Sequence, residues 1–161
     1  MSLVEVVADT DEIFKNADFV SLHVNASPET AGSVNQSKLE LMKPTAYLLN
    51  FSRGIIVKEQ DLIDALKNGI IKGAALDVFE KELIEADNPL LKMNNILLSP
   101  HCSAVTTEAL DRTSYGCMGI VEVLSGRKAR GRYQEKRRFG ALKNSNNQYC
   151  SKKGGKMFRL N

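Results

Sequence analysis

The segment AYLLNFSRG, residues 46–54, carries an apolar run that turns polar and then cationic over its last positions. A short apolar run bounded by turn residues is typical of a strand buried on both faces, as in a parallel sheet. Burying an unpaired charge costs several kcal/mol or more. We therefore expect Arg53 either to reach water at the strand end or to hold an anionic ligand.

Apolar runs of the same kind recur along the chain, and segments with helical patterns separate them. The runs occupy residues 19–24, 46–51, 73–78 and 95–100, with a weaker candidate at 3–7. The helical candidates occupy residues 9–17, 35–43, 58–69 and 106–126. This alternation predicts right-handed βαβ units. The predicted fold class is therefore α/β, with a partial Rossmann-type parallel sheet sandwiched by helices in three layers.

The expected helix ends differ in quality. Either Asp9 or Asp11 can cap the first helix, because both side chains accept hydrogen bonds from free backbone N–H groups. Lys58 precedes the third helix and is a poor N-cap, so we expect that helix start to fray. Gly69 and Gly126 follow the third and fourth helices, where glycine is a natural stop.

Composition indicates one globular domain in the cytoplasm. The chain has 161 residues, of which 43% are hydrophobic and 25% charged. No stretch approaches the roughly 18 consecutive apolar residues of a membrane span, and the N-terminus lacks the pattern of a secretory signal. The three cysteines form no C-x-x-C pair and suit free thiols in a reducing compartment. We see no metal-ligand spacing among Cys and His residues, so we expect no metal site.

Charge divides the chain near Gly126. Residues 126–161 hold twelve Lys or Arg and one acid, whereas residues 1–125 have a balance of −8. This basic tail has few apolar residues, so it cannot offset its ordering entropy, and we expect it to be poorly ordered. A basic tail can bind nucleic acid. We favour a solvated or foreign extension over that alternative.

Polar side chains follow the predicted strands at their carboxyl ends, where such sheets bind ligands. Arg53 offers a planar fork that can grip a carboxylate at two points. His101 can take or give a proton near neutral pH. Glu82 is a carboxylate that could orient the second ring nitrogen of His101, as the acid of a hydrolase triad does. Together the three residues suggest a working set for acid–base chemistry on an anionic substrate.

Three motifs in order, NFSRG (50–54), GAALDVFEKE (73–82) and LSPHCSA (98–104), carry a family resemblance together with ADFVSLHVNASPET (17–30). They resemble the NAD-binding half of the D-isomer-specific 2-hydroxyacid dehydrogenases, a family that includes phosphoglycerate dehydrogenases and hydroxypyruvate reductases. The resemblance covers about residues 9–126. Each motif alone is weak, and their ordered spacing is specific.

The resemblance implies a function and assigns roles. It implies an NAD-dependent oxidoreductase that moves a hydride between C2 of a small 2-hydroxy or 2-keto acid and nicotinamide, with NADP not excluded. Arg53 would hold the substrate carboxylate and keto oxygen, His101 would exchange the hydroxyl proton, and Glu82 would tune His101. The implied cofactor-binding residues are Val24, Asn25, Thr30, Asn50, Phe51, Ser52 and Asp77, of which Asp77 would bind the nicotinamide carboxamide.

The chain also departs from the family. Asn25 and Leu83 stand where the family usually has proline, and neither change removes a chemical group. The glycine fingerprint G-x-G-x-x-G does not occur, which leaves residues 1–125 as a partial NAD-binding domain. We therefore expect a fragment that binds NAD weakly or not at all and is inactive alone. Loss of the central first strand would expose one edge of the 19–24 strand and favour dimerisation or other association there.

An interaction protein is the alternative to an enzyme. Some relatives of this family act as transcriptional corepressors, so the same scaffold could serve without catalysis, through its sheet edge or through nucleic-acid binding by the basic tail. Retention of Arg53, Glu82 and His101 favours the enzyme.

Overall fold

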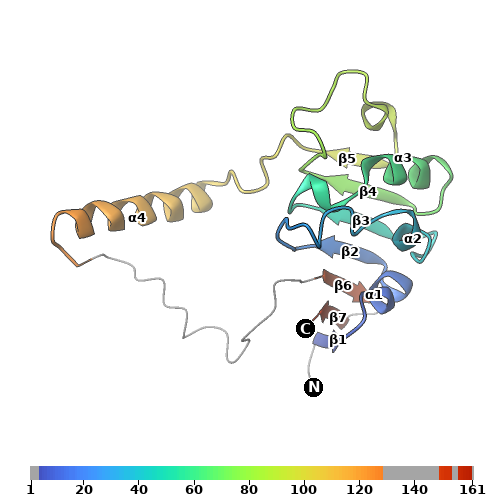
Figure 1. Ribbon diagram of the computed structural model, residues 1–161, viewed down its shortest axis with the longest axis horizontal. Helices are drawn as coiled ribbons and strands as arrows, with labels where there is room; N and C mark the ends of the chain where they lie inside the picture. Colours follow the sequence, from blue (N-terminus) through green and yellow to red (C-terminus); the bar gives the residue numbers. More distant parts are fainter. Residues whose placement is uncertain (1–3, 129–148, 154–155, 161) are drawn as a thin grey trace. The chain divides into compact units, whose positions relative to one another are not determined.

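The computed structural model describes residues 4–128, 149–153 and 156–160 (Figure 1). The chain forms two compact units, Met1–His101 with Ser145–Asn161 and Cys102–Asn144. The first unit contains the sheet, and the second contains the long helix α4 (Thr107–Leu124). Within the described residues, no helix has the length and apolar character needed to cross a membrane.

The first unit is built on a seven-stranded sheet of order β1-β7-β6-β2-β3-β4-β5. The strands are β1 (Val4–Val7), β2 (Phe19–Leu22), β3 (Tyr47–Asn50), β4 (Gly73–Leu76), β5 (Ile96–Leu98), β6 (Tyr149–Lys153) and β7 (Lys156–Leu160). Strands β2 to β5 are parallel neighbours, which confirms the predicted parallel α/β sheet. Leu22, Asn50, Leu76 and Leu98 lie in one register row. The carboxyl ends of the four strands are therefore level.

Short helices connect the strands. They are α1 (Thr10–Asn16), α2 (Gln36–Leu39), α3 (Glu59–Lys67) and the 3₁₀ turns η1 (Gly54–Ile56) and η2 (Pro89–Lys92). Asp9 is the cap of α1, because its side chain accepts a hydrogen bond from the Asp11 backbone N–H at 2.9 Å. Lys58 makes no side-chain cap at α3, as predicted. Gly69 has a φ of 65° after α3, a conformation that favours glycine.

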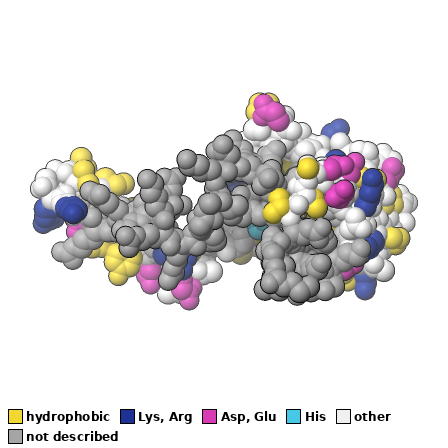
Figure 2. All heavy atoms as spheres, turned by 90° about the horizontal axis from the view of Figure 1, so that it is seen from below, with side chains coloured by type: hydrophobic (Ala, Val, Ile, Leu, Met, Phe, Trp, Pro, Cys, Tyr) yellow, Lys and Arg dark blue, Asp and Glu magenta, His cyan; other side chains and the backbone are white. Residues whose placement is uncertain are grey.

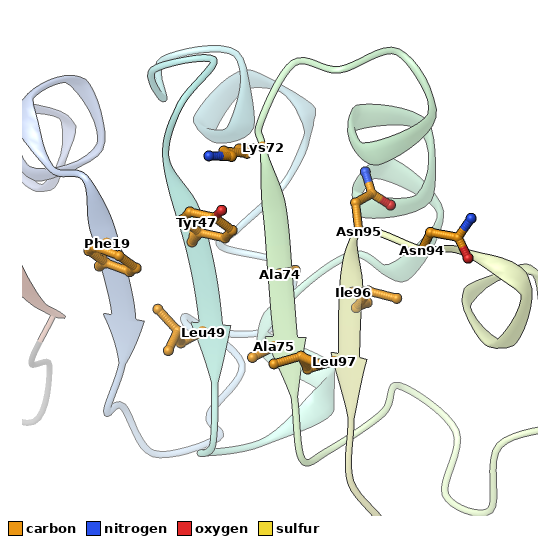
Figure 3. A pocket seen from close by; sticks show the side chains of 10 residues that line it. All are labelled: Phe19, Tyr47, Leu49, Lys72, Ala74, Ala75, Asn94, Asn95, Ile96 and Leu97. Atoms are coloured by element: carbon orange, nitrogen blue, oxygen red, sulfur yellow. The ribbon is translucent and has the colours of Figure 1, made fainter.

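Helices α1 to α3 cover one face of the sheet. The side chains on that face, such as Val20, Leu22 and Leu48, are fully buried in the core. On the opposite face Phe19 and Leu97 remain 49% and 76% exposed, and Figure 3 shows them, with Tyr47 between, among the side chains that line a pocket. The prediction of helices on both faces is not met among this unit's described residues. The reason is topological: right-handed crossovers that step in one direction along a sheet place every helix on the same side.

The described part of the basic tail forms two strands. β6 pairs antiparallel with β2, and β7 lies between β6 and β1. The sequence predicts an exposed edge on β2, whereas the structure places β6 on that edge. A poorly ordered tail stays a prediction. Unpaired backbone groups of an edge strand attract another strand, which gives the physical reason for the pairing. Residues 129–148, 154–155 and 161 of the predicted tail lie outside the described residues.

Charged side chains of both signs are interspersed on the described part of the surface in Figure 2, with apolar side chains among them.

Candidate active site

The loop that follows β3 is held by the side chain of its last strand residue. Asn50 is 1% exposed; its Nδ2 donates to the Arg53 carbonyl at 3.0 Å and its Oδ1 accepts from the Ser52 backbone N–H at 3.1 Å. Ser52 Oγ donates to the Val24 carbonyl of the neighbouring loop at 2.8 Å. The loop is thereby fixed at both its ends and its middle, and the exposed Arg53 side chain leaves it at the sheet edge.

Gly54 lets this loop pack against the loop that follows β4. A Cβ atom at Gly54 would lie 1.8 Å from the Phe79 carbonyl oxygen and 2.7 Å from the Glu80 nitrogen. The two backbones approach so closely that only glycine fits. The loop with Arg53 is therefore joined directly to the segment that carries Glu82.

Glu82 and His101 meet across the ends of β4 and β5. His101 Nδ1 lies 3.0 Å from Glu82 Oε2, and the two side chains are 46% and 48% exposed. His101 has a φ of 52°, and its N–H donates to the Ser99 carbonyl at 3.1 Å. This tight turn directs the ring back towards the loop after β4. The geometry is that of a base held by a carboxylate through one ring nitrogen.

A buried pair lies beside them. Asp77 follows β4 directly and is 0% exposed, and Ser99 Oγ, after β5, donates to Asp77 Oδ1 at 2.6 Å. The Asp77 backbone N–H donates to the Asn50 carbonyl at 3.0 Å, which ties the ends of β3 and β4 together. Ser99 is a site residue that the sequence analysis missed; its position in LSPH directly after a strand was the available signal.

The loops after β2 and β3 enclose a hollow of about 470 Å³, lined by His23, Val24, Asn25, Ala26, Ser52 and Arg53. Thr30 closes its loop, because Thr30 Oγ1 donates to the Asn25 carbonyl at 2.7 Å and accepts from the Ser27 N–H at 2.8 Å. A hydrogen bond from the Ser27 side chain lowers the pKa of Glu29. A hydrogen bond from the Glu29 backbone lowers it further, by a smaller amount.

The structure brings the expected residues together in three groups. Glu82 contacts His101, Asp77 contacts Ser99, and Arg53 shares the hollow with Val24, Asn25 and Ser52. Phe51 lies 40% exposed in the same loop as Arg53, while Thr30 is buried. The described contacts of Arg53 do not include His101; its Nη1 donates to the Ser52 carbonyl at 2.7 Å. Register places all three groups on one edge of the sheet.

The edge fits one half of a nicotinamide dinucleotide. Asp77 offers a buried carboxylate, which can accept a hydrogen bond from a carboxamide, and the hollow beside Arg53 is polar and open. The pyrophosphate of such a cofactor normally lies on a glycine loop at a helix N-terminus, and the 161 residues contain no G-x-G-x-x-G. The residues present therefore suit the nicotinamide side alone.

Comparison with known proteins agrees with this geometry. The chain is 42% identical over 119 residues to the glyoxylate reductase of Thermofilum pendens, which covers 73% of this chain and 35% of that protein. It is 45% identical over 106 residues to the D-3-phosphoglycerate dehydrogenase of Methanocaldococcus jannaschii, covering 66% of this chain and 20% of the other. The chain thus spans about a third or less of these relatives' length.

A solved structure shows the same fold. The NAD complex of the D-isomer specific 2-hydroxyacid dehydrogenase from Lactobacillus delbrueckii ssp. bulgaricus superposes with a TM-score of 0.67 at 30% identity, over 76% of this chain and 41% of that chain. Residues 2–103 match the model of the family's NAD-binding domain. The chain therefore belongs to the D-isomer specific 2-hydroxyacid dehydrogenase family and carries part of its NAD-binding domain.

Proposed function

We propose that this chain supplies the acid–base and carboxylate-binding part of an NAD-dependent oxidoreductase acting on small D-2-hydroxy acids. The observation that carries the proposal is the contact of 3.0 Å between Glu82 and His101 at the carboxyl edge of the parallel sheet. A histidine whose one ring nitrogen is held by a carboxylate presents the other nitrogen to a substrate.

His101 is the proton-transfer residue in this proposal, and Glu82 is its partner. The Glu82 carboxylate only accepts hydrogen bonds, so it holds a proton on His101 Nδ1 and leaves Nε2 to take the substrate hydroxyl proton. In the reverse direction the imidazolium gives that proton back, and Glu82 stabilises its charge. When bound, the nicotinamide of NAD supplies the hydride acceptor at C2 of the substrate.

Arg53 is the substrate-binding residue in this proposal. None of the ion pairs among the described residues includes Arg53, so the structural alternative of a surface ion pair at the strand end has no support there. Its guanidinium can bind a carboxylate and the neighbouring keto oxygen with two parallel N–H groups. The loop held by Asn50 keeps the guanidinium at the edge where Asp77 would hold the carboxamide.

A chimera tests the proposal, because the relatives extend well beyond this chain. Residues 2–103 replace the matching segment of the Thermofilum pendens glyoxylate reductase, and turnover of glyoxylate with NADH is followed. Changing His101→Ala should lower kcat by about 10²–10⁴-fold with KM largely unchanged. Changing Arg53→Ala should abolish turnover through lost substrate binding, and Arg53→Lys should restore it only in part because lysine lacks the fork.

Lys72→Ala is the matched control, since this exposed cation lies before β4 at the opposite end of the strand. It should retain full turnover. Equal losses of substrate binding in Arg53→Ala and His101→Ala would contradict the division of roles, and full activity of His101→Ala would end the proposal. The 161-residue chain alone should bind neither NADH nor NADPH with micromolar affinity, since it has no glycine loop.

Dimerisation and a cytoplasmic location stay predictions.

A further inference from the structure

The loop that carries Glu82 is held at both ends by one carboxylate. Glu59 lies in the first turn of α3; its Oε2 accepts from the Glu80 backbone N–H at 3.3 Å and its Oε1 accepts from Asn88 Nδ2 at 2.6 Å. Residues 80 and 88 bracket Glu82 along the chain. One side chain therefore closes the whole loop onto the start of a helix.

We call the contacts of Glu59 with Glu80 and Asn88 the clamp. Glu59 and Glu80 each accept a hydrogen bond from the other's backbone N–H, and the Asn88 amide has a fixed orientation. Glu80 Oε2 accepts from the Glu59 backbone N–H at 3.3 Å, so it satisfies a free N–H at the start of α3 that Lys58 leaves uncapped. Asn88 Oδ1 accepts from the Leu90 N–H at 2.9 Å as the cap of η2. This second bond fixes the amide so that its NH₂ group faces Glu59. Hydrogen bonds to a charged acceptor are about twice as strong as neutral ones.

The middle of the loop has little other support. Lys81 pairs with Glu85 inside the loop, and Leu83 is 91% exposed. Ile84 packs partly against the core. The Glu82 carboxylate is itself half-exposed, so its position against His101 depends on where the loop ends are fixed.

We propose that Glu59 is a positioning residue for the Glu82–His101 pair, acting through the ends of the loop. This inference rests on the proposed function, because it concerns the geometry of the same acid–base pair. Glu59 does not touch the reacting groups. It sets where Glu82 lies, and thereby which ring nitrogen of His101 carries the proton.

Two variants each remove a hydrogen bond of the clamp, one by changing Glu59 and the other by changing Asn88. Glu59→Gln keeps the size of the side chain, but its amide offers one acceptor oxygen where two are used, so one loop end is released. Asn88→Asp keeps the cap oxygen for Leu90, removes the donor to Glu59 and places a like charge beside it. Asp61→Asn is the matched control: Asp61 lies in the same turn of α3, accepts from the Gln36 N–H at 2.8 Å and makes no described hydrogen bond to this loop.

The readout is the ring tautomer of His101 in the full 161-residue chain, measured by long-range ¹H–¹⁵N correlation at a pH where the ring is neutral. The chain has two histidines, so the spectrum is simple to assign. The unsubstituted chain should show hydrogen on Nδ1. Glu59→Gln and Asn88→Asp should each lower that fraction by about twofold or more, as should Glu82→Ala, because the ring loses its fixed acceptor. Asp61→Asn should leave it unchanged.

The outcomes separate the two proposals. If Glu82→Ala shifts the tautomer and neither clamp variant does, the positioning role of Glu59 is overturned while the acid–base pair stands. If Glu82→Ala also leaves the tautomer unchanged, the pair itself is absent in solution and both proposals fall. A loss of thermal stability shared by Glu59→Gln and Asp61→Asn with an unchanged tautomer would assign Glu59 a structural role alone.

Discussion

Gly54 shows how one residue joins two parts of the candidate site. Its missing side chain lets the loop after β3 touch the Phe79 backbone, and Arg53 and Glu82 extend from the two loops that meet there. A side chain at this position meets backbone atoms, which cannot rotate aside. The glycine in NFSRG is therefore required by close packing between loops, and its φ is not in the left-handed region.

We predict that Gly54→Ala destabilises the fold by about 3 kcal/mol or more, because the new Cβ would overlap a carbonyl group. Gly69→Ala is the control. Apart from Gly69 and its two chain neighbours, no atom lies within 4 Å of a Cβ placed there, so its positive φ alone should cost about 1–2 kcal/mol. Urea denaturation of both variants measures the difference. Equal losses for the two variants would contradict close packing at Gly54.

The sequence predicted which residues lie at the candidate site, but it did not predict which of their side-chain atoms contact each other. Arg53, Glu82 and His101 were placed by strand ends and motif spacing, because parallel strands bring their carboxyl ends to one edge. The bond from Ser99 to Asp77 joins residues 22 positions apart, and no local pattern specifies which side-chain atoms meet. The cofactor-binding role of Asn50 stays a prediction, and its described bonds hold the loop of Arg53, which no local sequence pattern specifies.

The helices follow local sequence signals closely. Asp9 caps α1 through the Asp11 N–H, which settles the two alternatives that the sequence left open. Ile13 and Phe14 are the buried residues of that helix, and they anchor it against the sheet. Only these two residues of α1 are buried, so the cap is a large part of what fixes the start of this helix.

Changing Asp9→Ala should cost about 0.5–2 kcal/mol, because it leaves the Asp11 N–H without its acceptor. Asp9→Ser should recover most of this loss, since serine is an equally good N-cap. Equilibrium unfolding in urea measures both. A serine variant as unstable as the alanine variant would show that the charge near the helix start, and not the cap, carries the effect.

Strand lengths and one helix start depended on tertiary structure. The apolar runs at 46–51 and 95–100 contain strands of only four and three residues, because the chain turns as soon as it leaves the sheet. At α3 the sequence predicts a fraying start after Lys58. The structure supplies the missing acceptor from Glu80, 21 residues away, which sequence periodicity does not reveal.

At the scale of the whole molecule, the order of the strands in the sheet determines on which face of the sheet the connecting helices pack. Apolar runs and helical patterns predicted the parallel sheet, but they carry no information on which side of the sheet each connection passes. Stepping from β2 to β5 in one direction leaves Phe19 and Leu97 on an open face. The family relatives extend beyond this chain, and a doubly wound sheet covers its second face with helices from its other half.

The edge of β2 is covered by β6, from a tail that composition alone assigns to disorder. Residues Phe19 to Leu22 pair antiparallel with residues 149–152. Pairing with β2 therefore protects the backbone groups whose exposure the sequence analysis expected to drive association.

Removing residues 127–161 should therefore make the chain associate, because β2 would regain unpaired N–H and C=O groups along an apolar edge. Light scattering over a range of protein concentrations should show a mass that rises with concentration for the truncated chain and stays constant for the full chain. Ser21→Lys in the truncated chain is the discriminating variant, since a charged residue on an edge strand opposes strand addition without altering the core. It should lower the association.

If truncated and full chains behave alike, β6 does not protect β2 in solution. If truncation causes association that Ser21→Lys leaves unchanged, the contact between copies forms elsewhere. The open face with Phe19 and Leu97 then becomes the surface to mutate.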